Sequence, residues 1–345
     1  MSFGHTLYQR IEAMWWSRQT PPASLRLLSR AYDAISRANL ESRFNKRVRP
    51  ALPMISVGNI SVGGSGKTPF VIWLAELLSS KGYRPVVLCR GDGGKLRSPK
   101  LLDSSTPAEL CGDEAKLLAN ACDCPVIAGR DRVAASALAD GHGDILILDD
   151  GFQYRQLERI LDVVLIPATG LGNGFQIPAG PLRENIQALE RADFIVRTGN
   201  ESTFSPLTEK KNWYWLSEPS GLKQVDGIAA KAPKQCIAAT AIARPERFFN
   251  DLRNLGLTLE KAFSFPDHHR FSRQEAASLL HHGLPIIVTG KDAVKLKPLW
   301  EALGASQPLW VLEQKATPEQ GLPDALLEHI LSHLDTSAPA ASQPE

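Results

Sequence analysis

An apolar run, a glycine-rich loop and a helical run follow one another without a break between residues 54 and 80. The run MISVG predicts a buried strand, and KTPFVIWLAELLSS predicts a helix whose first turn tolerates a proline. The loop between them follows the G-x-x-x-x-G-K-[ST] spacing, except that Ser61 stands at the first glycine position. In this setting, successive backbone N–H groups converge on phosphate oxygens beside a helix N-terminus. The segment therefore predicts a phosphate-binding loop and not a chance cluster of glycines.

We expect this loop to bind the nucleotide through eight consecutive residues: Ser61, Val62, Gly63, Gly64, Ser65, Gly66, Lys67 and Thr68. Lys67 would reach the β- and γ-phosphates, and the hydroxyl of Thr68 would ligate Mg²⁺. ATP and Mg²⁺ are the expected cofactors.

Short apolar runs alternate with helical ones along the same part of the chain. Strands are expected at 54–58, 85–89, 125–128, 144–150, 162–166 and 193–198, and helices beginning at Lys67, Asp113, Asp131 and Glu184. Continuous apolar strands separated by helices are typical of a parallel sheet that is covered on both faces. The expected fold class is therefore α/β, with a P-loop NTPase-like parallel sheet core flanked by helices.

A chain of 345 residues suggests about two domains. We expect a basic helical arm at 1–50, the P-loop core at 51–200, an irregular or hairpin linker at 201–232, a smaller α/β domain at 233–335 and a disordered tail at 336–345. In the smaller domain, the pattern predicts a strand at 236–242, a helix over 245–256, a helix from Ser272, and strands at 285–290 and 308–313.

The first fifty residues carry nine Lys and Arg against three acidic residues, although the whole chain has a net charge of only +2. Apolar residues recur at helical spacing at Leu25, Leu28, Tyr32 and Ile35. Arginines interrupt this run, so no stretch reaches the ~20 apolar residues of a spanning helix. The pattern favours an amphipathic arm on an anionic membrane surface, and the alternative is a helix packed on its own domain. No cleavage site of a secretory signal follows, and no nucleic-acid reader motif accompanies the arm.

The cysteines form neither a C-x-x-C pair nor a metal-ligand spacing, which indicates reduced thiols: Cys89, Cys111, Cys122, Cys124 and Cys236.

Acidic residues stand at two places where they could serve a nucleotide site. Asp149 and Asp150 end the apolar run DILILDD, which places them at the carboxyl edge of the sheet as candidate Mg²⁺ ligands. Asp113 and Glu114 open a predicted helix, where N-capping and a general base or metal-shell carboxylate are equally good interpretations. Further along, His268 in FPDHHRF follows an aspartate, as an oriented imidazole would, but paired loop histidines are often plain surface residues.

The motifs GNISVGGSGKTP, RGDGGK, GDE, DDGFQ, IPAGPLRE, PERFF, FPDHH and TGKDAVKL, in this order, resemble the tetraacyldisaccharide 4′-kinase (lipid A 4′-kinase) family between about residues 53 and 297. In that family the first loop position is commonly Thr or Ser, so Ser61 is a mark of the family. The resemblance implies transfer of the ATP γ-phosphoryl group to the 4′-hydroxyl of an acylated glucosamine disaccharide 1-phosphate lipid. It also implies peripheral attachment to the cytoplasmic face of the bacterial inner membrane. We expect a monomer that binds no nucleic acid.

The resemblance also implies roles for individual residues. Asp113 would accept the hydroxyl proton, assisted by His268, and Lys67 would act on the phosphates. The residues implied near Mg²⁺ are Thr68, Glu114, Asp149, Asp150 and Glu184. The arginines implied as substrate contacts are Arg90, Arg130, Arg132 and Arg183.

Four positions depart from the family pattern: Asp92 replaces a usual Tyr, Tyr154 a His, Pro167 an Asp and Gly290 a Glu. None of them removes a residue with an implied catalytic role. The principal alternative is a membrane-associated P-loop switch ATPase, which would hydrolyse ATP without a lipid acceptor. A GTPase is excluded because the chain lacks a correctly placed N-K-x-D motif.

Overall fold

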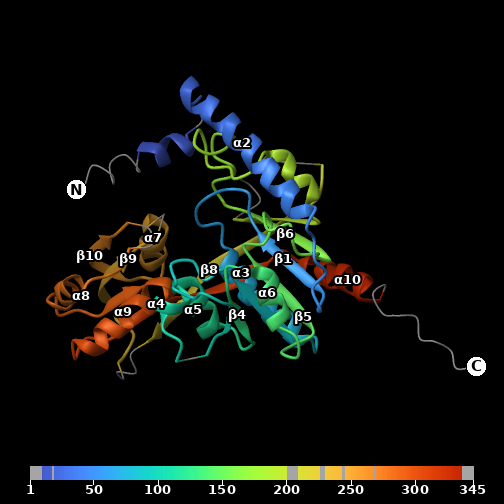
Figure 1. Ribbon diagram of the computed structural model, residues 1–345. Coiled ribbons are helices and arrows are strands. Elements are labelled where there is room, and N and C mark those ends of the chain that lie inside the picture. The colour runs from blue at the N-terminus through green and yellow to red at the C-terminus, as the bar shows by residue number, and fades with distance from the viewer. Residues whose placement is uncertain are drawn as a thin grey trace, which may run out of the picture.

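The computed structural model describes residues 10–17, 19–103, 105–199, 209–225, 230–242, 245–266 and 269–335. The strands of this described part form one sheet in the order β10-β9-β11-β12-β8-β7-β6-β1-β5-β2-β4-β3. Figure 1 shows helices on both faces of this sheet. The expected α/β class, with a large and mostly parallel sheet flanked by helices, is confirmed.

All six strands predicted in the P-loop core are present. They are β1 (Met54–Gly58), β2 (Pro85–Cys89), β4 (Val126–Ala128), β5 (Ile145–Asp149), β6 (Leu161–Ile166) and β7 (Phe194–Thr198). They pair in parallel, and the short β3 (Lys100–Leu101) adds an antiparallel edge. Every residue of these six strands is buried, which explains why the sequence shows continuous apolar runs without alternation.

Two layers of helices cover this half of the sheet. On one face, α3 (Lys67–Ser80), α5 (Asp113–Ala121) and α10 (Leu322–Asp335) share a core with Ile55 and Val57 of β1. On the other face, α6 (Arg132–Leu138) and the 3₁₀ helix η1 (Ile186–Arg191) pack on alternate strand residues. The short α4 (Ala108–Cys111) precedes α5. The helix expected to begin at Glu184 is instead this 3₁₀ helix, because the side chain of Asn185 caps it at the backbone N–H of Gln187.

The segment expected as an irregular or hairpin linker contains a long strand, β8 (Asn212–Gln224). It pairs in parallel with β7 and antiparallel with β12 (Leu309–Pro318), so it joins both halves into one sheet. Turn-forming residues in this segment suggested a loop, but the strand accommodates them. Glu313 pairs with Gly221, and the next residue, Gln314, pairs with Pro219. This register shift accommodates the intervening Ser220 as a bulge within the ladder.

The remaining elements are β9 (Gln235–Thr240), α7 (Pro245–Asn254), β10 (Thr258–Ser264), α8 (Arg273–Leu280), β11 (Ile286–Val288) and α9 (Gly290–Ala302). Ser272 and Glu275 form a capping box that starts α8 at the predicted place. The strand β10 and the helices α9 and α10 were not predicted. Helix α9 packs against α5, and α10 returns to the core of the N-terminal half. Figure 1 shows α10 at the opposite end of the molecule from α7, α8 and β10.

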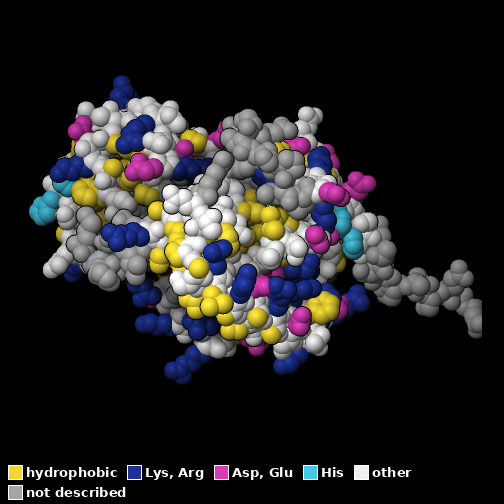
Figure 2. Space-filling view, turned by 90° about the horizontal axis from the view of Figure 1, so that it is seen from above, with side chains coloured by type: hydrophobic (Ala, Val, Ile, Leu, Met, Phe, Trp, Pro, Cys, Tyr) yellow, Lys and Arg dark blue, Asp and Glu magenta, His cyan; other side chains and the backbone are white. Residues whose placement is uncertain are grey.

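The N-terminal arm consists of a short helical segment at 10–15 and the long helix α2 (Ala23–Phe44). One side of α2 is attached to the body: Ser29 Oγ donates to the Gln176 carbonyl at 2.8 Å, and the Tyr32 hydroxyl to the Arg183 carbonyl at 3.2 Å. The opposite side exposes large apolar side chains, and Figure 2 shows hydrophobic side chains bordered by Lys and Arg on the face that α2 covers. The interpretation of a helix packed on its own domain therefore holds for one side of α2, and attachment to a membrane through the other side stays a prediction. Among the described helices, none is long and apolar enough to cross a membrane.

Candidate active site

The glycine-rich loop between β1 and α3 leaves its backbone open on one side. Gly63 and Gly66 have φ angles of 93° and 80°, in the left-handed region that favours glycine, and Gly66 is the N-cap of α3. A Cβ atom built on Gly63 or Gly64 would meet no other atom within 4 Å. The loop therefore leaves room beside its backbone at Gly63 and Gly64, just before the start of α3, as a phosphate site requires.

Buried polar residues fix the base of this loop. Asn59 Nδ2 donates to Ser65 Oγ at 2.9 Å, and Gln153 Nε2 donates to the Asn59 carbonyl at 2.9 Å. Gln153 also donates to Glu184 Oε1 at 3.1 Å, and Glu184 accepts from Arg191 at 2.9 Å. The carboxylate of Glu184, expected near the metal, is therefore held by Gln153 and Arg191. Through Gln153, it supports the start of the loop at Asn59.

The two aspartates at the end of β5 lie directly beside the loop. Because β1 and β5 are neighbours in register, Val57 pairs with Asp149. Asp150 has φ 52°, and both of its oxygens accept from Arg183 Nη1, at 2.9 and 2.8 Å. Lys67 Nζ lies 3.4 Å from Asp150 Oδ1. The structure thus brings together Lys67, the aspartate pair and Arg183, as the sequence predicted.

The two aspartates have opposite electrostatic environments. Burial raises the pKa of Asp149 to about 7, with the charge of Lys67 opposing this and the charges of Asp150 and Glu114 adding to it. Burial also acts to raise the pKa of Asp150, but the charges of Lys67 and Arg183 together outweigh it and lower the value to about 2. Asp150 is thus a fixed partner of cations, whereas at Asp149 the positive charges of Lys67 and Arg132 do not offset the effect of burial.

The residues around Asp149 suit a divalent cation. Oδ1 of Asp149 is buried and has no hydrogen-bond partner, and it is a hard oxygen of the kind that Mg²⁺ prefers. No cluster of three or more acidic, His or Cys side chains with metal-ligand geometry occurs among the described residues. Mg²⁺ in nucleotide sites usually takes one or two protein carboxylates and completes its shell with water and substrate phosphates. Thr68, in the first turn of α3, supplies the expected hydroxyl.

Two lysines of α9 hold the acidic start of α5. Lys295 Nζ lies 3.6 Å from Asp113 Oδ2 and 3.7 Å from Oδ1 of the buried Asp292. Lys291 Nζ lies 3.3 Å from Glu114 Oε1. Neither acid caps the helix with its side chain, because the N-cap is Gly112. The N-capping interpretation of Asp113 is therefore wrong, and its carboxylate instead faces the C-terminal half of the molecule.

His268 and Asp267 lie outside the described residues, so the structure does not describe that expected catalytic histidine. The residue after it is fixed: Lys295 Nζ donates to the His269 carbonyl at 3.1 Å, and His269 Nε2 lies 3.1 Å from both carboxylate oxygens of Glu275. The same lysine therefore contacts both Asp113 and the loop that contains the D-H-H sequence.

The other arginines expected as substrate contacts differ in accessibility. Arg90 is exposed and lies 3.1 Å from Asp92, so the residue that replaces the usual tyrosine has an ionic partner. Arg130 is exposed as well. Arg132 is only 5% exposed, donates to the Asp149 carbonyl at 3.3 Å and lies over the Tyr154 ring. Arg132 therefore supports the end of β5, and its contact with substrate stays a prediction.

The sequence interpretation missed Lys291, Lys295 and Asp292 as members of the site. Their signal was present in TGKDAVKL, where the two lysines are four residues apart and so share one face of a helix. Asp292 accepts from the hydroxyls of Thr240 and Thr289 at 2.8 and 2.7 Å, which orients it toward Lys295. What the sequence could not indicate is that α9 packs against α5.

Comparison with known proteins agrees with this geometry. The family model described as tetraacyldisaccharide-1-P 4′-kinase (LpxK) matches residues 22–331. The tetraacyldisaccharide 4′-kinase of Azoarcus sp. (strain BH72) is 36% identical over 92% of this chain and 94% of its own length. That of Thiobacillus denitrificans (strain ATCC 25259) is 38% identical over 80% of this chain and 84% of its own length.

Among solved structures, that of LpxK from Aquifex aeolicus in complex with ATP superposes with a TM-score of 0.74 at 30% identity. It covers 90% of this chain, and the chain covers 98% of it. With the family model spanning all the elements that build the site, the chain belongs to the tetraacyldisaccharide-1-P 4′-kinase family.

Proposed function

We propose that the protein transfers the γ-phosphoryl group of ATP to the 4′-hydroxyl of tetraacyldisaccharide 1-phosphate, which yields lipid IVA in lipid A synthesis. The observation that carries the proposal is the meeting of an open phosphate loop, Lys67 and a paired carboxylate at neighbouring strand ends. Helix α5, which Asp113 begins, packs against α3, the helix that follows the phosphate loop.

Each residue has a physical task in this reaction. The N–H groups of the loop and the ammonium group of Lys67 neutralise the phosphate oxygens and fix the γ-phosphorus for in-line attack. When bound, Mg²⁺ would be held by Thr68 and Asp149 and would neutralise charge on the β- and γ-phosphate oxygens. Asp113 accepts the proton of the 4′-hydroxyl while the hydroxyl oxygen forms a bond to the γ-phosphorus. The bond from the γ-phosphorus to the oxygen that bridges it to the β-phosphate breaks, and ADP leaves. His268, on the loop tethered by Lys295, assists this proton transfer.

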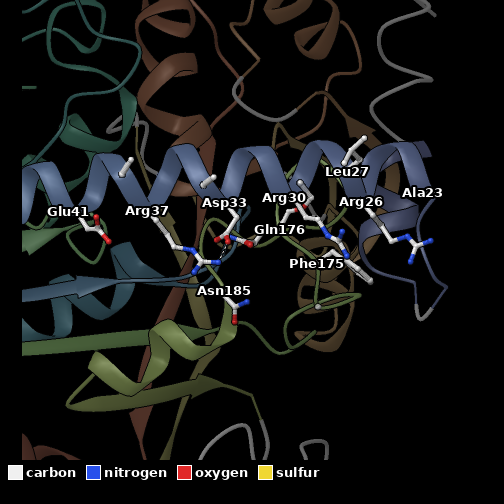
Figure 3. A pocket seen from close by; sticks show the side chains of 14 residues that line it. Ala23, Arg26, Leu27, Arg30, Asp33, Arg37, Glu41, Phe175, Gln176 and Asn185 are labelled. Carbon is white, nitrogen blue, oxygen red and sulfur yellow. Dashed lines mark hydrogen bonds and ion pairs between the residues drawn. The ribbon is translucent and has the colours of Figure 1, made fainter.

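The lipid acceptor suits the groove beside α2. This groove has a volume of about 1120 Å³ and is lined by α2 and by residues 174–176 and 185. Figure 3 shows Arg26, Arg30 and Arg37 along it, with Asp33 bonded to both Arg37 and Gln176. Arginine guanidinium groups suit the 1-phosphate of the acceptor.

The outer side of α2 suits a membrane surface. Leu27, Leu28 and Ile35 are 68%, 55% and 64% exposed; Leu28 and Ile35, two helical turns apart, share one side of α2, and Leu27 also lines the groove. An amphipathic helix of this kind lies in the interface between headgroups and acyl chains. The protein would thus meet its lipid acceptor as a monomer on the cytoplasmic face of the inner membrane.

The test uses the full chain in detergent micelles with Mg²⁺, γ-labelled ATP and tetraacyldisaccharide 1-phosphate. We expect label in the lipid, and Asp113→Asn should lower kcat at least about a hundredfold, since general-base catalysis contributes that much. Asp123→Asn, which makes the same change at an exposed position beyond the other end of α5, is the matched control. ATP hydrolysis without labelled lipid would favour the switch ATPase instead.

A further inference from the structure

A second cavity, of about 180 Å³, lies where the end of α2 meets the body. We call it the arginine pocket; its lining residues are Phe44, Arg47, Arg155, Arg159, Asp162, Arg191 and Asp193. They come from three places in the sequence: the end of α2, the segment after the DDGFQ motif, and the end of η1 with the residues that follow. None belongs to the phosphate loop or to the groove beside α2.

Each acidic residue of the pocket accepts a hydrogen bond from the protein, while Oδ1 of Asp162 is buried without a hydrogen-bond partner. Asp162 Oδ2 accepts from Arg159 Nε at 2.8 Å, and Asp193 Oδ2 accepts the backbone N–H of Asp162 at 2.8 Å. Arg191 is paired with Glu184 at 2.9 Å. The pairs Arg159–Asp162 and Arg191–Glu184 therefore neutralise two of the four arginines.

The other two arginines have no carboxylate partner within the described part of the chain. Arg47 and Arg155 both lie on the ring of Phe44, with guanidinium carbons 4.9 and 4.7 Å from its centroid. Arg155 Nε is buried and has no hydrogen-bond partner. A guanidinium stacked on a ring keeps its N–H edge free for other acceptors, and this planar fork matches phosphate oxygens.

The environment of Arg155 is unfavourable without a counter-ion. Burial lowers its pKa, and the positive charges of Arg191 and Arg159 lower it further, against the smaller opposing effects of the charges of Glu184 and Asp162. An anion in the pocket would relieve this repulsion and supply acceptors to the unpaired N–H groups. The volume of the arginine pocket is several times the ~30 Å³ that a water molecule occupies in the liquid, so a phosphate group with bridging water fits.

We propose that the arginine pocket binds a phosphate group, separately from the kinase site. The group is either the phosphate of an anionic lipid headgroup or free inorganic phosphate. The position favours the headgroup, because Phe44, which lines the pocket, is itself 42% exposed at the end of the helix whose outer side is apolar.

The test compares two double variants that lose the same charge. Arg47→Gln/Arg155→Gln alters the pocket, while Lys46→Gln/Arg49→Gln removes two exposed cations from the same end of α2 but outside the pocket. Binding of inorganic phosphate is measured by calorimetry at constant ionic strength, with the phosphate loop filled by a non-hydrolysable ATP analogue. We expect at least about tenfold weaker binding in the pocket variant and no change in the control, since a hydrogen bond to a charged group contributes about 1.5–3 kcal/mol.

A second arm identifies the source of the phosphate. Both variants are sedimented with phosphatidylcholine vesicles that contain phosphatidic acid or phosphatidylglycerol. If only the pocket variant loses sedimentation with the vesicles, the pocket binds a lipid headgroup. If both variants sediment equally but the pocket variant has lost phosphate binding, the pocket binds free phosphate. Phosphate binding that is equal in wild type and both variants would overturn the proposal. Arg47→Gln alone, at the exposed position, repeats the test if the double variant unfolds.

Discussion

Asp149→Asn should stabilise the metal-free protein at alkaline pH while it abolishes kinase activity. Asp149 is 7% exposed, its Oδ1 has no partner, and burial raises its pKa to about 7. In the unfolded chain, an aspartate has a pKa of about 3.9. A carboxyl group whose pKa is raised on folding contributes its full stability below the unfolded value and loses it as pH rises through the folded value.

The size of the effect follows from this shift of about three units. At 1.36 kcal/mol a unit, Asp149 destabilises the folded protein by about 4 kcal/mol once the pH is well above 7, where it is ionised, and by about 1.5 kcal/mol near pH 5, where it must take up a proton on folding. Asparagine has nearly the same shape and does not ionise, so it avoids this penalty. The free energy of unfolding of Asp149→Asn, relative to wild type, should therefore rise by about 3 kcal/mol between about pH 5 and pH 8.

Urea denaturation without Mg²⁺, at both pH values and for both proteins, measures this difference from the transition midpoints. Asp123→Asn, at an exposed position, controls for general charge effects. If the difference in free energy of unfolding between Asp149→Asn and wild type changes by less than about 1 kcal/mol between the two pH values, the reasoning is refuted. Mg²⁺ with ATP should stabilise the wild type at about pH 8 and have a smaller effect on Asp149→Asn, because the variant lacks the charged ligand.

Three other substitutions test separate parts of the structure. Lys67→Ala should lower kcat at least about a hundredfold with little change in thermal midpoint, as loss of one charge-stabilising donor does. Asp292→Ala should lower the free energy of unfolding by about 3–5 kcal/mol, since this fully buried carboxylate accepts from three protein groups and contacts a lysine. The triple variant Leu27→Ser/Leu28→Ser/Ile35→Ser should no longer sediment with vesicles. Its free energy of unfolding should stay within about 1 kcal/mol of the wild-type value, because these side chains are mostly exposed.

Local chemistry made the phosphate loop and its neighbouring aspartates predictable. A parallel sheet places the carboxyl ends of its strands at one edge, so the end of β1 and Asp149 had to meet once the strands were identified. The linker strand β8 was not predictable in the same way, because Pro219 and Gly221 are turn formers and only pairing with β12 makes them part of a ladder. The burial of Arg132 was not predictable either, since an arginine beside an active-site motif looks the same in sequence whether it is exposed or enclosed.

The contact between α5 and α9 shows why the C-terminal half is needed for the chemistry. Asp113 is at the N-terminus of α5, where the helix dipole favours its negative charge, and Lys295 adds a second positive group at 3.6 Å. That separation is longer than a hydrogen bond of about 2.7–3.2 Å, so the hydroxyl of an acceptor can bind the carboxylate without displacing a strong bond. Because Lys295 also holds the His269 carbonyl, one side chain positions both the proposed base and the loop that follows His268. The proposed proton acceptor thus belongs to the half that contains the phosphate loop, and its orientation depends on the other half.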